Sequence, residues 1–373
     1  MEFVQAKSSQ EAEILDFINY VFSQSKVPHD FKKLLPFVYN KDGFSELHFV
    51  AEENGRIKGT VALLPFTLRV GNAKLNAGFV GSVSVHPYER GRGIMKALMD
   101  KLDKKAQEEK LDLVFLGGRR HRYMYFGYER CGTHLMFNLN GDSLRHALYD
   151  VDEKGYGFVA FDMASDSQIK KAYDMYLQKQ KFTAERDLET FKEKAKSQFA
   201  QGYVFTKGEE ALGYIILSQD NNIEEMSLEK KFIRPCLKSA IIKFGDCKAV
   251  CPAWDTELFM ELQEISEGYQ IFSRNMLRVY NWERVLNASL QLKQKPLKEG
   301  RVLFEIENAG TFYIEINKEN AKAYETQEKA EIKLTQEQTV RLLFSPVGMF
   351  DKVSDEFFNW LPLPMELAVP DGF

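Results

Sequence analysis

The hydrophobic positions predict a strand, a turn and a helix in succession over residues 79–106. The Val-rich run of residues 79–85 ends at His86–Pro87 and is typical of a strand. From residue 94 onward the apolar side chains recur at spacings of three and four, the period of an amphipathic helix: Met95, Leu98, Met99, Leu102 and Ala106. The intervening residues 88–93 contain two glycines and two arginines.

The rest of the first 150 residues predicts an antiparallel sheet preceded by a helix. Residues 11–24 have the helical period. Asn54–Gly55 separates two apolar runs and is the strongest short hairpin signal. The strands that we expect here lie at residues 48–52, 58–64, 66–70, 74–85 and 113–116.

A second segment, from about residue 155 to residue 280, is expected to repeat this order of elements. Its helices are predicted at residues 168–180, 187–199 and 234–244, and its strands at 203–206, 211–217, 224–228 and 249–251. In this comparison Arg234–Leu237 stand where Arg90–Gly93 stand in the first segment. Because the glycines are missing there, we expect a degenerate copy that does not bind a pyrophosphate.

The last segment is expected to form a small α+β unit followed by a tail. Its strands are predicted at residues 301–306, 311–316 and 330–334, and its helix at residues 335–343. Pro362 and Pro364 exclude a regular helix, so residues 361–373 should be extended and span on the order of 40 Å. The tail is apolar and should be buried along a groove through these side chains: Leu361, Leu363, Met365, Leu367, Val369 and Phe373. The expected fold class is therefore α+β (mixed α/β), with domains at residues 1–150, 151–283 and 284–373.

The charge, the apolar runs and the cysteine spacing argue against several classes of protein. The net charge of −4 and the lack of a Lys/Arg block argue against nucleic acid as a partner. The chain starts without a basic region and apolar run, and no stretch approaches 18 apolar residues, so we expect a cytoplasmic protein without a membrane partner. The cysteines lack the spacing of a metal site, so we expect buried free thiols and no metal: Cys131, Cys236, Cys247 and Cys251.

The turn before the first long helix carries candidate chemistry. Backbone N–H groups at the start of a helix have no intrahelical partner and lie at the positive end of its dipole, which suits a phosphate. Gly91 and Gly93 allow a close backbone approach and a positive φ. A nucleotide P-loop would need Gly-Lys-Ser/Thr, and a dinucleotide site would need Gly-x-Gly-x-x-Gly; the sequence has neither. The segment Arg90–Met95 instead resembles R-x-x-G-x-[GA], the pyrophosphate loop of the GNAT acetyltransferases, with Met95 in place of the usual small residue.

The whole chain resembles the Eis-type (enhanced intracellular survival) GNAT N-acetyltransferases. The resemblance rests on this loop, on Tyr123-x-x-Phe126-Gly127-Tyr128, on Leu277–Val279 and on the terminal Phe373. It implies an active acetyltransferase domain, a degenerate second one, a sterol-carrier-protein-like third domain and a homo-hexamer.

The resemblance also implies roles for individual residues. Tyr123 would be the general acid, and the free α-carboxylate of Phe373 the general base. Acetyl-coenzyme A would contact Val83, Ser84, Val85, Arg90, Gly91, Arg92, Gly93, Ile94, Met95, Lys96, Gly118 and Arg119. Residues 118–122 are unusually basic for the family. This positive charge argues against carrying over the family's preference for substrates with several amino groups.

Physical chemistry supports these roles without deciding them. A backbone N–H at Val85, where the strand splays, would hold the oxyanion. A phenol, with a pKa near 10, is a sensible proton donor to a departing thiolate. Tyr125 and Tyr128 are the competing tyrosines, more simply explained by packing. His86 and His121 are alternative bases that more often only satisfy local hydrogen bonds.

Two functions from different classes remain after the sequence is read. The first is transfer of an acetyl group from acetyl-coenzyme A to a primary amine of a small molecule or a lysine side chain. The second is a lipid or small-molecule carrier that uses the third domain, with the other two as scaffold. The intact glycine loop favours the enzyme, and the sequence does not identify the amine. Arg119, Arg120 and Arg122 could contact coenzyme phosphates or form a solvated loop.

Overall fold

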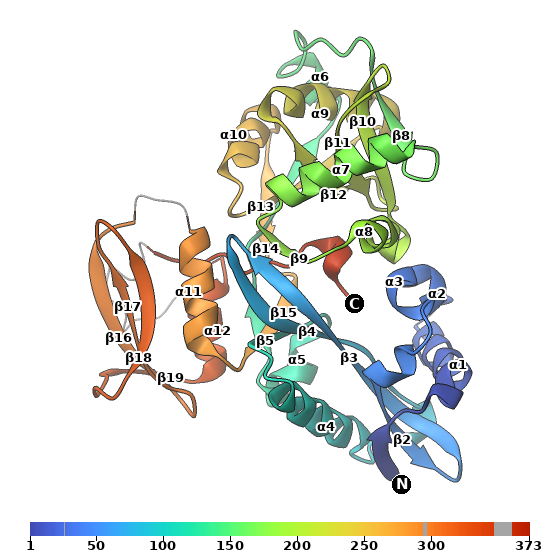
Figure 1. Cartoon of the computed structure of the whole chain (residues 1–373), viewed down its shortest axis with the longest axis vertical. Helices are drawn as coiled ribbons and strands as arrows, with labels where there is room; N and C mark the ends of the chain where they lie inside the picture. Colours follow the sequence, from blue (N-terminus) through green and yellow to red (C-terminus); the bar gives the residue numbers. More distant parts are fainter. Residues whose placement is uncertain (26, 294–296, 347–359) are drawn as a thin grey trace.

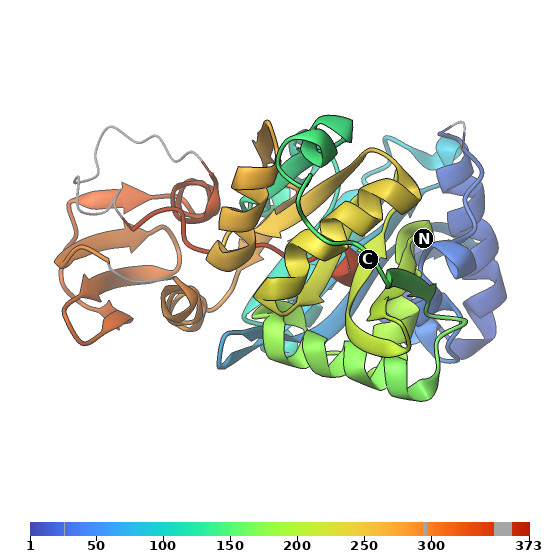
Figure 2. The same ribbon diagram turned by 90° about the horizontal axis from the view of Figure 1, so that it is seen from above.

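The computed structural model describes residues 1–25, 27–293, 297–346 and 360–373. Three β-sheets with helices packed on them form three units, and the described end of the chain runs between the first two units (Figure 1). The predicted mixed α/β fold is confirmed. Seen from above, the third unit projects to one side, while the C-terminus lies in the middle of the other two (Figure 2).

The first unit is a sheet with the order β1-β2-β3-β4-β5-β15-β6. Its strands are β1 (Glu2–Gln5), β2 (His48–Glu53), β3 (Arg56–Val70), β4 (Ala73–Val85), β5 (Leu113–Leu116), β6 (Glu129–Cys131) and β15 (Asn275–Val279). Its helices are α1 (Glu11–Ser23), α2 (Phe31–Leu34), α3 (Pro36–Tyr39), α4 (Ile94–Glu108) and α5 (Arg120–Tyr123). The hairpin around Asn54–Gly55 and the strand–turn–helix at β4 and α4 are confirmed.

The second unit has the sheet order β8-β10-β11-β12-β13-β7-β14. Its strands are β7 (His134–Leu139), β8 (Tyr156–Ala160), β10 (Gln201–Lys207), β11 (Glu210–Leu217), β12 (Ile223–Leu228), β13 (Cys247–Pro252) and β14 (Tyr269–Phe272). Its helices are α6 (Gly141–Arg145), α7 (Asp166–Lys179), α8 (Leu188–Lys194), α9 (Lys230–Phe244) and α10 (Thr256–Ile265). A short strand, β9 (Phe182–Ala184), leaves this unit and pairs with β3 of the first.

The two sheets match position by position and exchange one strand each. In each, antiparallel strands lead to a parallel pair, β4 with β5 and β12 with β13, joined by a crossing helix. The sixth position is filled by β15 in the first sheet and by β7 in the second. Since β7 precedes residue 150 and β15 follows the whole second sheet, a cut at residue 150 does not separate the two sheets.

The third unit is a four-stranded sheet with the order β18-β17-β16-β19 and two helices. Its elements are α11 (Trp282–Leu292), β16 (Gly300–Ile306), β17 (Gly310–Ile316), β18 (Ala321–Thr326), β19 (Ile332–Leu334) and α12 (Gln336–Phe344). The sequence predicted β16, β17, β19 and α12 but missed α11 and β18.

Three predicted boundaries were wrong. Residues 58–64 and 66–70 form one strand, β3, because Pro65 lies between the end of the β2 pairing at Ala62 and the start of the β9 pairing at Leu68. There the missing N–H of a proline breaks no ladder on that side. Helix α8 ends at Lys194 rather than at residue 199, and Gln198 and Phe199 take positive φ angles of 55° and 59°.

The helix predicted to start at residue 234 starts at Lys230, with one residue between it and the end of β12 at Leu228. Arg234–Leu237 therefore lie inside α9 and do not correspond to the glycine turn, as the sequence comparison had it. The second unit has only Glu229 where the first has the whole turn between β4 and α4. The second unit still lacks a glycine loop, but the evidence is the single residue Glu229 between β12 and α9 rather than Arg234–Leu237.

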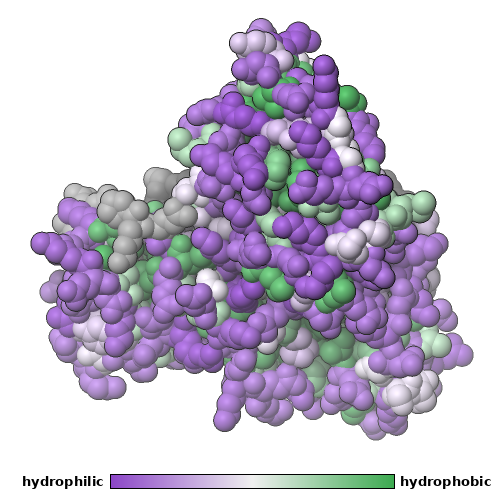
Figure 3. Space-filling view, turned by 45° about the horizontal axis from the view of Figure 1, so that its top comes forward, coloured by the Kyte–Doolittle hydropathy of each residue, from purple (hydrophilic) through white to green (hydrophobic). Residues whose placement is uncertain are grey.

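The tail is buried as predicted. Trp360, Leu363, Met365 and Leu367 are each only 1% exposed and belong to the core that joins the first and third units. The tail ends in a 3-10 turn, η6 (Val369–Asp371), followed by Gly372 and the half-buried Phe373. Figure 3 shows that hydrophilic side chains cover most of one face of the molecule, with smaller hydrophobic groups between them.

One further expectation can be compared with the structure. The four cysteines are buried and free, as predicted. Among the helices in the described residues, none is long and apolar enough to cross a membrane.

Candidate active site

The turn before α4 has the backbone that its glycines predict. Gly91 and Gly93 have φ angles of 83° and 76°, and Gly93 is the N-cap of α4. Both are exposed, and a Cβ on either would meet open space. The first N–H groups of α4 therefore face outward at the positive end of the helix dipole, the arrangement that suits a phosphate.

The arginines of this turn have different surroundings. The Arg92 guanidinium is bound by Glu89 and by Glu53, 3.2 Å away at the β2–β3 hairpin, so this side chain fixes the turn. Arg90 is exposed and, within the described part of the chain, has no assigned ion pair; the same holds for Lys96 in the first turn of α4. These two cations, together with the helix N-terminus, leave the turn suited to a polyanion.

Strands β4 and β5 diverge next to this turn. Their parallel pairing ends at Val80 and Leu116, but β4 continues to Val85. A bulge accompanies the divergence: Ser82 has a φ of 52°, and the register against β3 shifts nearby. Val83, Ser84 and Val85, which were predicted to bind the coenzyme, lie beyond the last β4–β5 pair. Backbone groups on that edge of β4 are not used by β5 and can bind an extended ligand.

Tyr123 lies at the β5 side of this divergence. It ends α5, and its ring packs against Gly118, where a Cβ would lie 3.1 Å from the ring. The side chain is 8% exposed. Burial raises the pKa of its phenol, an effect that the nearby Arg122 partly opposes, so the hydroxyl keeps its proton at neutral pH. The two competing tyrosines differ from it, because Tyr125 is 81% exposed and Tyr128 is 1% exposed in the core.

The C-terminal residue lies at the β4 side of the same divergence. A Cβ on Gly81, the residue after the last β4–β5 pair, would lie 2.1 Å from the Phe373 ring. The ring also stacks on Tyr39, with centroids 6.1 Å apart and planes 20° apart. The tail from the third unit thus returns to the first unit, as its length allows. Tyr123 packs on Gly118, just after β5 ends, and Phe373 packs on Gly81, just after the last β4–β5 pair, although 250 residues separate the two side chains in the sequence.

A buried polar chain below Phe373 was missed by the sequence reading. Tyr39 bonds to Ser82 at 2.6 Å and to His48 at 3.2 Å, and the other ring nitrogen of His48 is 2.9 Å from the Thr60 hydroxyl. Burial lowers the pKa of His48 to about 3 and raises that of Tyr39, so both groups are neutral at pH 7. The chain anchors the bulge at Ser82. No sequence motif marks it, because its members come from four separate elements.

The basic residues 119–122, which follow β5, have two kinds of surroundings. Arg120 pairs with the buried Glu129 at 2.6 Å, and Arg341 of α12 binds the same carboxylate. These cations hold the pKa of Glu129 at about 2, against the opposing effect of its burial. Arg120 is therefore a structural residue rather than a phosphate ligand. Arg119, His121 and Arg122 are exposed.

The other alternative residues are also placed. His86 stacks on Tyr20 of α1, with ring centroids 5.6 Å apart, and its Nδ1 accepts the N–H of Tyr88. Among the described residues, no group of three or more His, Cys, Asp or Glu side chains could hold a metal ion.

The comparisons with known proteins agree with this geometry. Residues 2–131 match the family model described as an acetyltransferase (GNAT) domain. The match runs from β1 to β6 and includes the glycine turn and Tyr123. No curated protein matches the chain.

Solved structures extend the likeness beyond the first unit. A GCN5-related N-acetyltransferase from Anabaena variabilis superimposes with a TM-score of 0.71 at 16% identity, covering 100% of both chains. Eis1 from Mycobacterium abscessus does so with a TM-score of 0.67 at 13% identity, also over 100% of both chains. A probable N-acyltransferase from Enterococcus faecalis covers 91% of this chain and 89% of its own, with a TM-score of 0.66 at 17% identity. The chain thus shares its complete fold with GNAT-type proteins.

Proposed function

We propose that the protein is an N-acetyltransferase that transfers the acetyl group of acetyl-coenzyme A to a primary amine. The observation that carries this proposal is the convergence at the end of the β4–β5 pairing. A glycine turn suited to a pyrophosphate and a free strand edge lie there, with the buried phenol of Tyr123 packed beside Gly118 and the ring of Phe373 packed beside Gly81. The match of residues 2–131 to the GNAT domain supports the same chemistry.

The proposed coenzyme site is the first unit. The pyrophosphate would lie on the N–H groups of Gly91 to Lys96, with Arg90 and Lys96 as counter-charges and Arg92 acting through its backbone. The acyl arm would then lie along Val83 to Val85, in the opening between β4 and β5. Gly118 and the exposed Arg119 border the β5 side of this opening.

The proposed reaction uses one proton donor and one proton acceptor. The neutral amine attacks the thioester carbonyl carbon, and the N–H of Val85 stabilises the oxyanion. As the carbon–sulfur bond breaks, Tyr123 donates its proton to the thiolate. The terminal carboxylate of Phe373 orients the amine and accepts its proton. The products are the amide and coenzyme A; solvent then returns a proton to Tyr123 and takes one from the carboxyl group of Phe373.

The acceptor belongs to the primary amines, either on a small molecule, such as an aminoglycoside-like or polyamine compound, or on a lysine side chain. The proposal keeps the second unit as a degenerate copy without a coenzyme site, since Glu229 alone stands between β12 and α9. The sterol-carrier-like third unit and the hexamer expected from the Eis-type resemblance remain proposals.

A thiol-release assay tests this function. The full-length protein is mixed with acetyl-coenzyme A and a panel of amines that contains an aminoglycoside, spermidine and a lysine peptide. Release of free thiol that requires both the protein and one amine, with an acetyl mass increase on that amine, is the expected result. If no amine produces thiol and acetyl-coenzyme A does not bind, the enzyme proposal fails and the carrier is favoured.

A further inference from the structure

A second cluster of ionised groups lies beneath the last residues of the chain. Asp371 is 1% exposed and stands two residues before the C-terminus. Its Oδ1 accepts from Arg186 Nε at 2.8 Å and from Lys194 Nζ at 2.9 Å. Its Oδ2 accepts from the Thr183 hydroxyl and the Ala184 N–H, both at 2.9 Å. Every contact anchors the tail to β9, α8 or the residues beside them.

The cluster is continuous with the second unit. The remaining nitrogens of Arg186, Nη1 and Nη2, bind the two oxygens of Glu225 in β12 at 2.9 and 2.7 Å. Tyr214 donates its hydroxyl to the same carboxylate at 2.6 Å. The Arg186 guanidinium also lies 4.9 Å from the centre of the Tyr176 ring.

The charges of this cluster balance only when the tail is in place. Arg186 and Lys194 carry two positive charges, and Glu225 supplies one negative charge. Asp371 supplies the other. Burying ions is costly unless they are paired, and a buried pair is weak evidence for stability as such. Such a cluster is better suited to fixing the tail in one position along its groove than to adding stability. Fixing the register of a segment is an attested role of buried polar groups.

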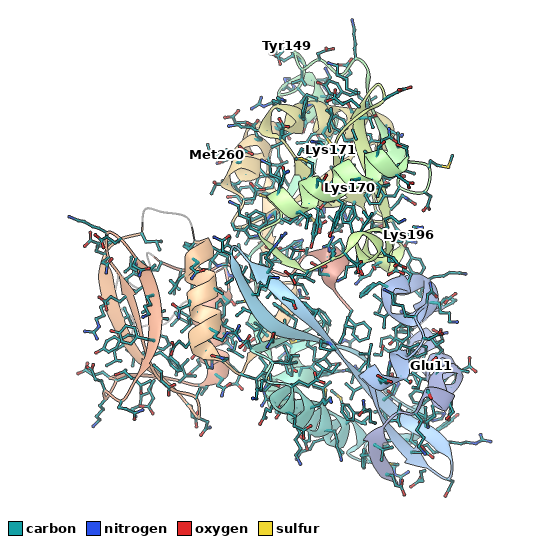
Figure 4. All side chains as sticks on the ribbon, in the orientation of Figure 1. Glu11, Tyr149, Lys170, Lys171, Lys196 and Met260 are labelled. Carbon is teal, nitrogen blue, oxygen red and sulfur yellow. The ribbon has the colours of Figure 1, made fainter. Side chains whose placement is uncertain are left out.

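The location of the cluster supports that role. In the second sheet, β12 and β13 are paired at only one position, Ile223 with Ala249, and then diverge. The tail fills this divergence: Glu366, Ala368 and Val369 line it, and a cavity of about 20 Å³ is left, room for about one water. Figure 1 shows the end of the tail between the two sheets, and in Figure 4 side chains of both units fill the space around it, with Lys196 just beyond α8.

We propose that Asp371 is a positioning residue, which holds the terminal carboxylate of Phe373 at the opening between β4 and β5. This inference rests on the catalytic role proposed for that carboxylate. Gly372 and Phe373 follow the anchored Asp371 directly, so a fixed Asp371 leaves the terminus little freedom. Lys194 links the anchor to the first unit as well, because its ammonium lies 4.7 Å from the centre of the Phe37 ring.

The test compares two buried carboxylates of the same tail. Asp371→Asn removes the charge two residues from the end, whereas Glu366→Gln removes one seven residues from the end, where Glu366 pairs with His134. Three quantities are measured in the full-length protein: the rate at which a carboxypeptidase releases the terminal phenylalanine, kcat, and the Kd for acetyl-coenzyme A. The first quantity reports the position of the tail without reference to catalysis.

For Asp371→Asn we expect release of phenylalanine at least tenfold faster and kcat about 10- to 100-fold lower, with Kd within about twofold. For Glu366→Gln all three should change by less than about threefold. If Asp371→Asn does not fold, Lys194→Met removes one of the four contacts and should still accelerate release at least about threefold.

Unchanged release in the folded Asp371→Asn or Lys194→Met protein overturns the inference. Faster release with an unchanged kcat overturns it too, because the held tail would then not position the base. Equal effects of Glu366→Gln and Asp371→Asn would show a general loosening of the tail and would also contradict it. Failure of the proposed function has a different signature, which is absence of turnover by the unaltered protein.

Discussion

The first and second units have the same strand order but differ at the opening between their parallel strands. In the first unit the strands diverge after Val80 and Leu116, and a turn of two left-handed glycines stands beside the opening. In the second unit the opening beside β12 is filled by the tail, and a single residue, Glu229, replaces the turn. The difference teaches that one loop decides whether this architecture offers a polyanion site.

Gly93→Glu should produce the largest effect, loss of acetyl-coenzyme A binding. The substitution forces a side chain onto a positive φ and places a negative charge at the proposed pyrophosphate site. Calorimetry should detect no binding. Lys230→Glu is the matched control, because it places the same charge at the start of α9 and should leave Kd unchanged. An unaltered affinity of Gly93→Glu for acetyl-coenzyme A would contradict the claim that the glycine turn makes the first unit, and not the second, the coenzyme site.

Blocking the chain terminus should lower transfer by the next largest amount. Appending three residues after Phe373, or deleting Gly372 and Phe373, removes the proposed base from the opening and should reduce kcat on the order of 10³-fold while acetyl-coenzyme A still binds. Phe373→Leu keeps the carboxylate and should keep much of the activity.

The close approach of Phe373 to Gly81 offers a second form of this experiment. Gly81→Ala should impair transfer, since a Cβ there overlaps the ring, and the smaller side chain of Phe373→Leu should partly restore it. A C-terminally extended enzyme with normal turnover would show that another group, such as His86 or a water, is the base.

Tyr123→Phe should have a somewhat smaller effect. It keeps the ring packed on Gly118 and removes only the proton donor, so kcat should fall about 10²-fold with Kd nearly unchanged. Tyr128→Phe is the control, since Tyr128 lies in the core. If Tyr128→Phe is the impaired variant, the acid has been assigned to the wrong tyrosine.

The smallest expected effect is on the free energy of unfolding. Its pH dependence should distinguish the buried His48 of the first unit from the buried Asp371 anchored to the second. His48 in the first unit is neutral when folded, with a pKa lowered to about 3, and an unfolded histidine titrates near 6.5. The unfolded state therefore binds more protons, and the free energy of unfolding should decrease as the pH falls from about 6.5 toward 3, by up to about 1.4 kcal/mol per pH unit. Despite the burial of Asp371, Arg186 and Lys194 hold the pKa of its carboxyl group below the ordinary value. The contribution of this carboxylate to the free energy of unfolding is therefore lost only below about pH 4.

Urea unfolding at several pH values checks this separation. Between pH 6 and pH 5, His48→Gln should flatten the decrease, while Asp371→Asn should leave the slope there unchanged. An equal slope in wild type and His48→Gln would contradict the origin assigned to it.

Short-range patterns in the sequence predicted much of the first unit. The Asn54–Gly55 hairpin, the β4–turn–α4 succession and the burial of the apolar tail all follow from alternation, helical spacing and glycine placement. The start of α9 was misplaced when Arg234–Leu237 were set against Arg90–Gly93; the helix forms an earlier turn, with Pro235 inside it, and gives up the hydrogen bond that the proline lacks.

The strand exchange could not be predicted in this way. The apolar residues of β7 and β15 show that these strands are buried, but not which sheet accepts them, because both sheets offer an equivalent sixth position. The polar chain from Ser82 to Thr60 was missed for a related reason. Tyr39 and His48 resemble ordinary core residues until the fold brings them to the bulge in β4. The anchor at Asp371 likewise depends on contacts with residues 177 to 188 positions earlier in the chain.

The most direct test of the account is the number of acetyl-coenzyme A molecules bound per chain. Isothermal titration of the full-length protein measures this number without knowledge of the acceptor. We predict one molecule per chain, bound by the glycine turn of the first unit. Two molecules per chain would show that the second opening also binds coenzyme despite the tail, and no binding at all would contradict the proposed function itself.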